Sequence, residues 1–168
     1  MRVTKAFFSL IAIFLAATTI SYAQPNHPHS PHDTIRTKDI TITYGRPYKK
    51  GRVIFGKLEA YGQTYRCGAD EPTLLTFAKD VKLAGHPVKA GTYALFAVPN
   101  ATSWTIILNT NITQWGTEHD QNASKDILKF DVPVVNLSTP VEQLTMTASN
   151  TSITLSWDLV KVVIPVQF

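Results

Sequence analysis

Short runs of β-branched and aromatic residues, each closed by a Gly, Pro or Asn turn, constrain the fold of this chain more than any other feature. Within most runs apolar and polar residues alternate, which is typical of strands that bury one face. No long stretch shows the i, i+3, i+4, i+7 apolar spacing of an amphipathic helix. The pattern therefore predicts an all-β fold: a single-domain antiparallel β-sandwich, jelly-roll-like, of about eight to ten strands.

The runs also predict individual strands and a core. Strands are expected at residues 40–44, 81–83, 93–98, 104–108, 127–135 with a break at Pro133, and 160–166, with a hairpin turn at 149–151 and a polar loop at 116–126. The expected core residues are Phe77, Leu83, Tyr93, Leu95, Trp104, Ile106, Leu155 and Trp157. An outer-membrane barrel would show similar alternation, but its strands need roughly 9–11 residues, more than most of these runs contain.

The first 23 residues have the composition of a secretory signal peptide. Arg2 and Lys5 precede an apolar run at residues 6–17, and Ser21 and Ala23 supply the small residues of a cleavage site. The apolar run is too short for a membrane-spanning helix, which needs about 20 residues. We expect cleavage after Ala23, export to the periplasm or the extracellular space, and no membrane-spanning segment in the mature chain.

Residues 24–34 are predicted to form a Pro- and His-rich linker before a single domain at residues 35–168. Prolines alternate there with His27, His29 and His32. We expect a solvated spacer, with loose binding of a metal ion by the imidazoles as the alternative. No metal site and no cofactor are assigned.

The mature chain is nearly neutral and contains one cysteine. Arg2 and Lys5 leave with the signal peptide, which reduces the formal net charge from +4 to +2. This charge is too small for a nucleic-acid-binding protein, so nucleic acid is not expected as a partner. One cysteine excludes an intramolecular disulfide, and Cys67 is expected to be buried.

The charges are distributed unevenly along the mature chain. Eight cations and two anions lie between Arg36 and Arg66, whereas six cations and nine anions follow from Cys67 onward. The basic segment either lines a site for an anionic ligand or complements the acidic remainder internally.

Two loops in and beside this basic segment carry most of the candidate ligand-binding residues. Gly and Pro fix the loop at residues 45–52, which can aim its cations at a carboxylate or phosphate. The loop at residues 65–72 places an arginine and two carboxylates between strands. The candidate ligand-binding residues are Arg46, Lys50, Arg52, Arg66, Asp70, Glu71 and Trp115. We expect Arg66 and Glu71 to bond each other or to share a cleft with another of these arginines; a salt bridge that only pins the turn is the alternative.

These loops also carry a family resemblance. The motif GRPYKKGRVIFG at residues 45–56, with YRCGADEPT at 65–73, resembles the signature of the bacterial domain of unknown function 2911 family. Further similar segments are TFAKDV at 76–81, AGTYALF at 90–96, WTIILN at 104–109, WG at 115–116 and LSW at 155–157. The central motif departs from the family pattern, with Tyr65 in place of Trp, Cys67 in place of Thr and Asp70 in place of Asn. The resemblance implies an exported bacterial β-rich domain and no particular reaction.

No catalytic residue is assigned, because neither a Gly-x-Ser-x-Gly elbow nor a phosphate-binding Gly-rich loop occurs. The consecutive residues Glu118, His119 and Asp120 are interpreted as an ordinary polar loop. The favoured function is a non-catalytic module that binds an anionic small molecule, a sugar-like ligand (a glycan) or an envelope partner. The alternatives are a hydrolase that uses Asp70, Glu71 or His119, and a purely structural envelope domain; the oligomeric state stays open.

Overall fold

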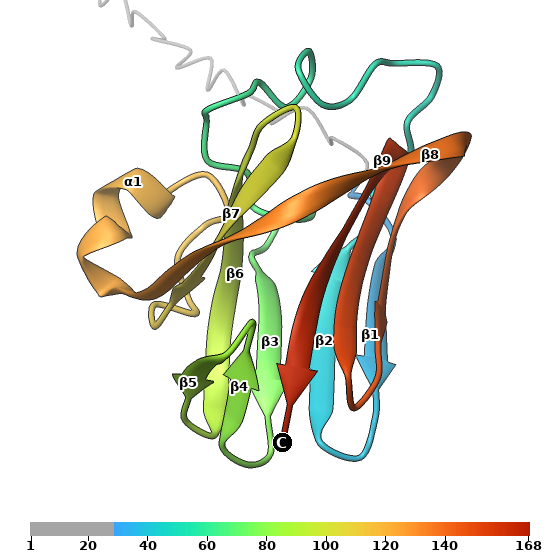
Figure 1. Ribbon diagram of the computed structural model, residues 1–168. Helices are drawn as coiled ribbons and strands as arrows, with labels where there is room; N and C mark the ends of the chain where they lie inside the picture. Colours follow the sequence, from blue (N-terminus) through green and yellow to red (C-terminus); the bar gives the residue numbers. More distant parts are fainter. Residues whose placement is uncertain (1–28) are drawn as a thin grey trace, which may run out of the picture.

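A computed structural model describes residues 29–168 of the chain (Figure 1). The predicted signal peptide and residues 24–28 of the predicted linker lie outside the described residues. The elements are β1 (His32–Arg36), β2 (Ile40–Gly45), β3 (Thr73–Phe77), β4 (Val81–Leu83), β5 (His86–Val88), β6 (Gly91–Pro99), β7 (Ser103–Asn109), the short helix α1 (His119–Asn122), the 3-10 turn η1 (Ala123–Lys125), β8 (Asp126–Ala148) and β9 (Ser152–Gln167). Within the described range no helix has the length and apolarity needed to cross a membrane.

The nine strands of the described residues form one antiparallel sheet in the order β1-β2-β3-β6-β7-β8-β9-β4-β5, with β1 and β5 as its edges. Strand β8 joins the two halves of this sheet. Its pairs with β7 end at Ser103–Pro133, and its pairs with β9 begin at Val134–Val162. The sheet thereby folds over, so that β9 and the second half of β8 face β1 and β2 across the core (Figure 1). The predicted all-β antiparallel architecture is confirmed.

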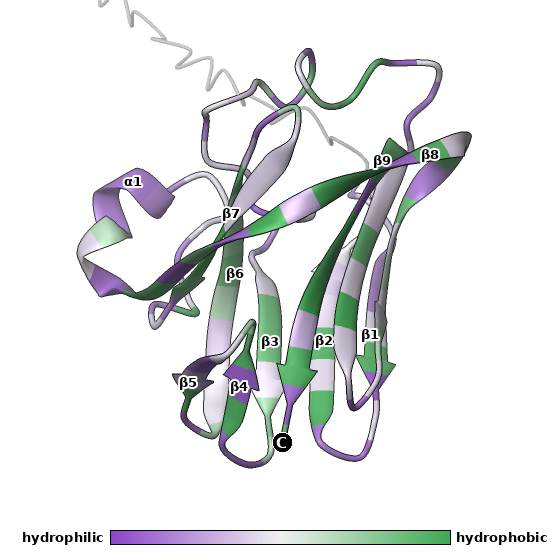
Figure 2. Ribbon diagram, viewed as in Figure 1, coloured by the Kyte–Doolittle hydropathy of each residue, from purple (hydrophilic) through white to green (hydrophobic). Residues whose placement is uncertain are grey.

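One buried cluster contains all eight residues of the predicted core. Along β2 and β9 buried positions alternate with more exposed ones, because successive side chains of a strand point to opposite faces. The alternating bands along these strands in Figure 2 follow the same period. Phe55, from outside the strands, lies edge-on to Trp104 and Trp157, with ring centroids 4.6 Å and 6.1 Å away.

The segment at residues 46–72, between β2 and β3, closes one end of the folded sheet (Figure 1, the loops at the top). Its side chains Ile54, Phe55 and Cys67 are buried in the core cluster. Its backbone is held to β6, since Tyr65 exchanges two hydrogen bonds with Ala97, of 2.7 Å and 2.9 Å. Much of the sequence motif at residues 45–73 therefore serves the core.

Two details differ from the sequence-based expectation. Strand β1 begins at His32, inside the predicted linker, because the Pro31 carbonyl accepts the Arg46 amide and His32 pairs with Gly45. The expected break at Pro133 is absent, and β8 continues through it. Proline has no N–H to donate, and Pro133 lies where β8 changes its partner from β7 to β9.

Candidate functional site

Arg46 of the candidate set ties three strands together. Its Nη1 lies 3.1 Å from the Asp33 carboxylate of β1. Its Nε donates to the Leu144 carbonyl at 3.1 Å and its Nη2 to Thr145 Oγ1 at 3.2 Å, both in β8. Because all three of these bonds are made within the fold, the Arg46 guanidinium has a structural role.

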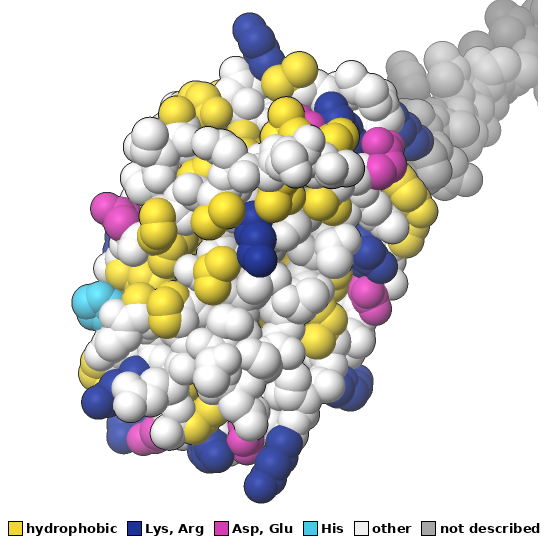
Figure 3. Space-filling model, turned by 45° about the vertical axis from the view of Figure 1, so that its right-hand side comes forward, with side chains coloured by type: hydrophobic (Ala, Val, Ile, Leu, Met, Phe, Trp, Pro, Cys, Tyr) yellow, Lys and Arg dark blue, Asp and Glu magenta, His cyan; other side chains and the backbone are white. Residues whose placement is uncertain are grey.

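Arg52 and Lys50 also make bonds within the fold. Arg52 donates to the carbonyls of Lys49 at 2.9 Å and Tyr48 at 2.6 Å, which holds its own loop in shape. The Lys50 amide donates to Glu142 Oε1 at 2.8 Å. On the face shown in Figure 3 the Lys and Arg side chains are scattered, several of them beside acidic ones. The cations of the 45–52 loop are therefore not gathered into one anion clamp.

Asp70 and Glu71 have different partners, both from the segment before and at the start of β1. Asp70 Oδ2 accepts the Ser30 amide at 2.9 Å, and the His29 ring lies 3.9 Å from its carboxylate. Glu71 Oε2 lies 2.7 Å from His32 Nε2. A hydrogen bond from its own backbone amide, reinforced by the His32 imidazole, holds the pKa of the Glu71 carboxyl below its ordinary value. Glu71 is therefore ionised near neutral pH.

A groove of about 540 Å³ lies beside the Glu71–His32 pair. It is lined by His32, Thr43, Tyr44, Gly45, Glu71, Pro72, Leu74, Ile112, Thr113, Gln114 and Trp115. The lining is mostly apolar, and its polar groups are few, the usual make-up of a small-molecule site. The indole of Trp115 is 45% exposed, whereas Trp104 and Trp157 are buried in the core.

The loop between β7 and α1 fixes Trp115 in this groove. The Trp115 amide donates to Glu118 Oε2 at 2.9 Å, and the Glu118 amide donates to the Trp115 carbonyl at 2.9 Å. The preceding Gln114 is buried and donates to Asn109 Oδ1 and the Asn111 carbonyl. Gln114 Oε1 accepts no hydrogen bond from the described residues. The loop thus holds the backbone of Trp115, and the exposed side chain of this residue forms an aromatic wall of the groove.

His119 belongs to the support of this loop rather than to the groove. Its buried ring lies between the carboxylates of Asp126 at 3.0 Å and Asp120 at 3.3 Å and packs on Phe96, with ring centroids 4.7 Å apart. Asp126 also accepts a hydrogen bond from Asn109 at 2.7 Å. This network connects the end of β7 to the start of β8. None of the residues named in it lines the groove.

Arg66 does not meet Glu71. Its Nε donates a long hydrogen bond of 3.4 Å to the Gly68 carbonyl, and its side chain lines a separate cavity of about 290 Å³ with Glu59. The expectation that Arg66 and Glu71 bond each other or share a cleft is therefore wrong for the cavities found among residues 29–168. Of the candidate set, the groove brings together Glu71 and Trp115.

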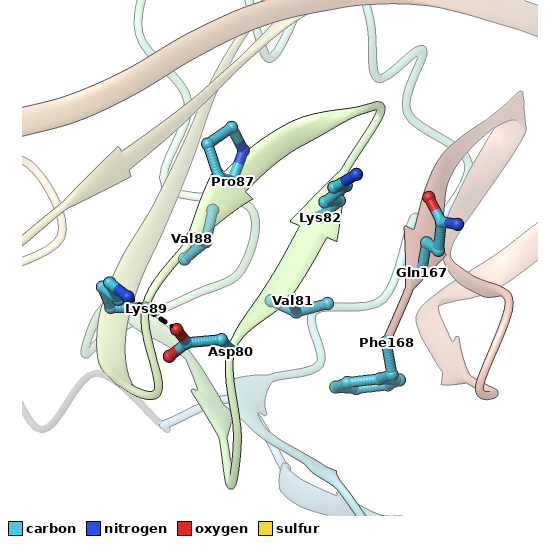
Figure 4. A pocket seen from close by; sticks show the side chains of 8 residues that line it. All are labelled: Asp80, Val81, Lys82, Pro87, Val88, Lys89, Gln167 and Phe168. Atoms are coloured by element: carbon cyan, nitrogen blue, oxygen red, sulfur yellow. Dashed lines mark hydrogen bonds and ion pairs between the residues drawn. The ribbon is translucent and has the colours of Figure 1, made fainter.

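A third depression, of about 410 Å³, lies at the β4–β5 hairpin and the chain end (Figure 4). Its lining residues are Asp80, Val81, Lys82, Pro87, Val88, Lys89, Gln167 and Phe168. Asp80 pairs with Lys89 at 2.7 Å, and both side chains are largely exposed. None of the candidate ligand-binding residues lies here, and an exposed ion pair contributes little energy.

The site does not assemble the parts of a hydrolase that the sequence suggested as an alternative. Glu71 lines the groove, whereas Asp70 and His119 do not. No cluster of three or more His, Cys, Asp or Glu residues in the described part of the chain is arranged to hold a metal ion.

Sequence reasoning missed several residues that shape the two cavities. The sequence pattern places His32 in the predicted linker, gives no signal for Gln114, and shows Glu59 only as one charge of the basic segment. Their signals were weak, since none belongs to a motif with a defined chemistry. His32 and Glu71 are 39 residues apart, and the pairing of β2 with both β1 and β3 brings them together.

Fold and site together define an all-β domain that is built on one folded antiparallel sheet. The groove and the cavity of Arg66 both adjoin the loop between β7 and α1. The family model described as protein of unknown function (DUF2911) matches residues 18–166, nearly the whole chain. The chain belongs to this family, as its motifs indicated. No match was found among curated proteins or among solved structures.

Proposed function

We propose that this protein is an exported, non-catalytic binding module that holds a sugar-like ligand in the groove of Trp115 and Glu71. The observation that carries the proposal is the 45% exposed Trp115 on the wall of this groove, whose backbone is held by hydrogen bonds to Glu118. An exposed aromatic face offers a flat apolar surface to the C–H face of a sugar ring.

The polar groups of the groove suit hydroxyls better than they suit an anion. Its ionisable side chains at the ligand face are the Glu71 carboxylate and the His32 imidazole, which already bond each other. The candidate cations Arg46, Lys50, Arg52 and Arg66 are not among the lining residues. A carboxylate accepts hydrogen bonds from hydroxyls and repels an anionic ligand. A neutral polyhydroxylated ligand therefore fits this groove.

Binding without hydrolysis follows from the same chemistry. Glycoside hydrolysis ordinarily needs two carboxyl groups across the scissile bond, one of them protonated. The groove has one carboxylate, and its lowered pKa keeps it ionised near neutral pH. Glu71 can orient a ligand but lacks the partner that such a reaction requires.

Titration of the mature chain with a panel of soluble oligosaccharides tests the proposal, by calorimetry and by tryptophan fluorescence. Because Trp104 and Trp157 are buried, a ligand-induced fluorescence shift reports on Trp115. Glu71→Gln should weaken binding by about tenfold or more, the loss expected for a hydrogen bond to a charged group. Trp115→Ala should weaken it by about tenfold or more because the aromatic surface under the sugar ring is lost. Leu159→Ala is the matched control, since Leu159 is also exposed but does not line the groove. A panel without any binder, or binding that both variants retain, would refute the proposal.

Export is the second part of the proposal and rests on the composition of residues 1–23. Protein recovered from the envelope or medium of a bacterial host should begin at Gln24. Intact-mass measurement decides this, and a protein that retains Met1 would contradict it.

A further inference from the structure

The smaller cavity, which is lined by Gly116 rather than by Trp115, has a chemistry different from that of the groove. It is lined by Glu59, Thr64, Tyr65, Arg66, Gly116 and Thr117 and shares no lining residue with the groove. Its volume is about 290 Å³ and its lining is mainly polar. Pockets for drug-sized molecules begin at about 300 Å³, so the space fits only a small ligand.

Two opposite charges line this cavity without neutralising each other. No ion pair joins Glu59 to Arg66 or to another cation of residues 29–168. The one hydrogen bond of the Arg66 guanidinium to the described residues is the 3.4 Å contact from Nε to Gly68. Burial raises the pKa of the Glu59 carboxyl, and the charges of Arg66 and Arg52 oppose this rise. Partly buried charges are normally paired with an opposite charge. The charged groups of Glu59 and Arg66 therefore remain able to form strong hydrogen bonds with a ligand.

The backbone holds both charged residues in fixed positions. The Glu59 amide donates to the Ile54 carbonyl at 3.0 Å, and the Glu59 carbonyl accepts the Gly56 amide at 2.8 Å. Arg66 directly follows Tyr65, whose backbone is paired with Ala97 of β6. The backbones of both residues therefore belong to an ordered frame rather than to free loops.

Gly116 gives the Arg66 side chain its place. A Cβ added at Gly116 would collide with Arg66 Cδ and would lie 3.0 Å from the Asp70 carbonyl oxygen. A residue without a side chain at this position lets the stem of Arg66 run beneath the turn. The guanidinium can then reach the cavity wall.

We infer that this cavity is a binding site for a small zwitterion of the α-amino acid class, whose carboxylate is held by Arg66 and whose ammonium group is held by Glu59. A guanidinium binds a carboxylate through two parallel hydrogen bonds, and a carboxylate accepts the protons of an ammonium group. A simple anion would be repelled by Glu59 and a simple cation by Arg66. The hydroxyls of Thr64 and Thr117 add uncharged donors and acceptors. This site is independent of the groove, so either can fail alone.

The test titrates the isotopically labelled mature chain with the standard L-amino acids and follows the amide resonances of Thr64, Gly116 and Thr117. L-Alaninamide, which lacks the carboxylate, and N-acetyl-L-alanine, which lacks the ammonium group, are matched probes. We expect saturable shifts with at least one free amino acid, and binding at least about tenfold weaker when either charge of that ligand is blocked. No saturable shift with any amino acid at millimolar concentration would overturn the inference. So would equal binding of a blocked analogue, which would show a site for one charge only.

Substitutions separate a binding role from a structural one. Glu59→Gln and Arg66→Gln should each weaken amino acid binding by at least about tenfold, whereas Lys57→Gln, an exposed change on the same loop, should leave it unchanged. Because Glu59 has no ion-pair partner among residues 29–168, Glu59→Gln should not lower the melting temperature of the unliganded protein. The inference would be overturned if Glu59→Gln and Arg66→Gln each lowered the melting temperature and the double variant were no less stable than either. That result would show that Glu59 and Arg66 stabilise the fold by pairing with each other.

Discussion

Lys49 and Asp158 form an ion pair, with Nζ and Oδ1 3.1 Å apart, that fastens the 46–72 segment to β9. The other carboxylate oxygen of Asp158 accepts the Ile54 amide at 3.2 Å. Both side chains are mostly buried, at 16% and 11% exposure. Asp158 itself has a φ of 53°, in the left-handed region that Asp and Asn tolerate best after Gly. One carboxylate thus holds the loop that carries Glu59 and Arg66.

Asp158→Ala should lower the free energy of unfolding by about 3–5 kcal/mol, because it leaves the Lys49 ammonium without its partner in a largely buried site. Asp158→Asn should cost less, since an amide oxygen still accepts the Ile54 amide and Asn tolerates positive φ. Urea denaturation followed by circular dichroism measures both. Asp80→Ala, which removes an exposed pair, is the control and should cost much less than Asp158→Ala. Equal losses at Asp158 and Asp80 would contradict this assignment.

Gly45→Ala should be far more destabilising than Gly51→Ala. A Cβ at Gly45 would collide with the carbonyl of Ala69, a backbone atom that cannot rotate away, so we expect a loss of about 3 kcal/mol or more. Gly51 has a φ of 73° but no atom within 4 Å of an added Cβ, so its cost is backbone strain of roughly 1–2 kcal/mol. Denaturation midpoints of the two variants give the comparison, and the reverse order would refute the packing argument.

The carboxyl of Glu71 should titrate below the ordinary range of glutamate. Its pKa is lower in the folded than in the unfolded chain, so its contribution to stability is present above the unfolded pKa and is lost as the pH falls through the folded pKa. His32→Ala should move the pKa part of the way up, because the backbone amide of Glu71 remains as the stronger cause. Carbon-13 NMR of the side-chain carboxyl measures this. His86→Ala, on β5, should leave the value unchanged, and an unchanged value in His32→Ala would contradict the contact.

The thiol of Cys67 should be unreactive in the folded protein. The residue is 1% exposed, and burial raises its pKa far above the ordinary value, with the charge of Glu59 adding to the rise. Since the thiolate is the reactive form, iodoacetamide should modify Cys67 only after unfolding in denaturant. Mass spectrometry of native and unfolded samples distinguishes the cases, and full labelling of the native protein would show that the end of the core opens.

The strands and the core could be predicted because they depend on local patterns. Alternation along residues 40–44 reflects one buried face of a strand, whereas the continuous apolar run at 93–98 reflects a strand buried on both faces. The large apolar side chains of both runs have no other favourable place than the interior. Pro133 illustrates the limit of such reasoning. The sequence predicts a break there, but only the pairing of β8 with two partners shows that the strand tolerates the proline.

The sequence by itself determined the class of fold, the burial of Cys67 and the loops in which polar residues collect, because each follows from hydrophobicity and period over a few residues. Only the tertiary structure decided which polar side chains meet. Arg66 and Glu71 are five positions apart, but Cys67 and Asp70 between them adopt positive φ values of 53° and 64°. These turns direct the two side chains into different cavities. Glu71 meets His32 instead, through the pairing of β2 with both β1 and β3, because side-chain direction after a turn depends on backbone angles that long-range contacts impose.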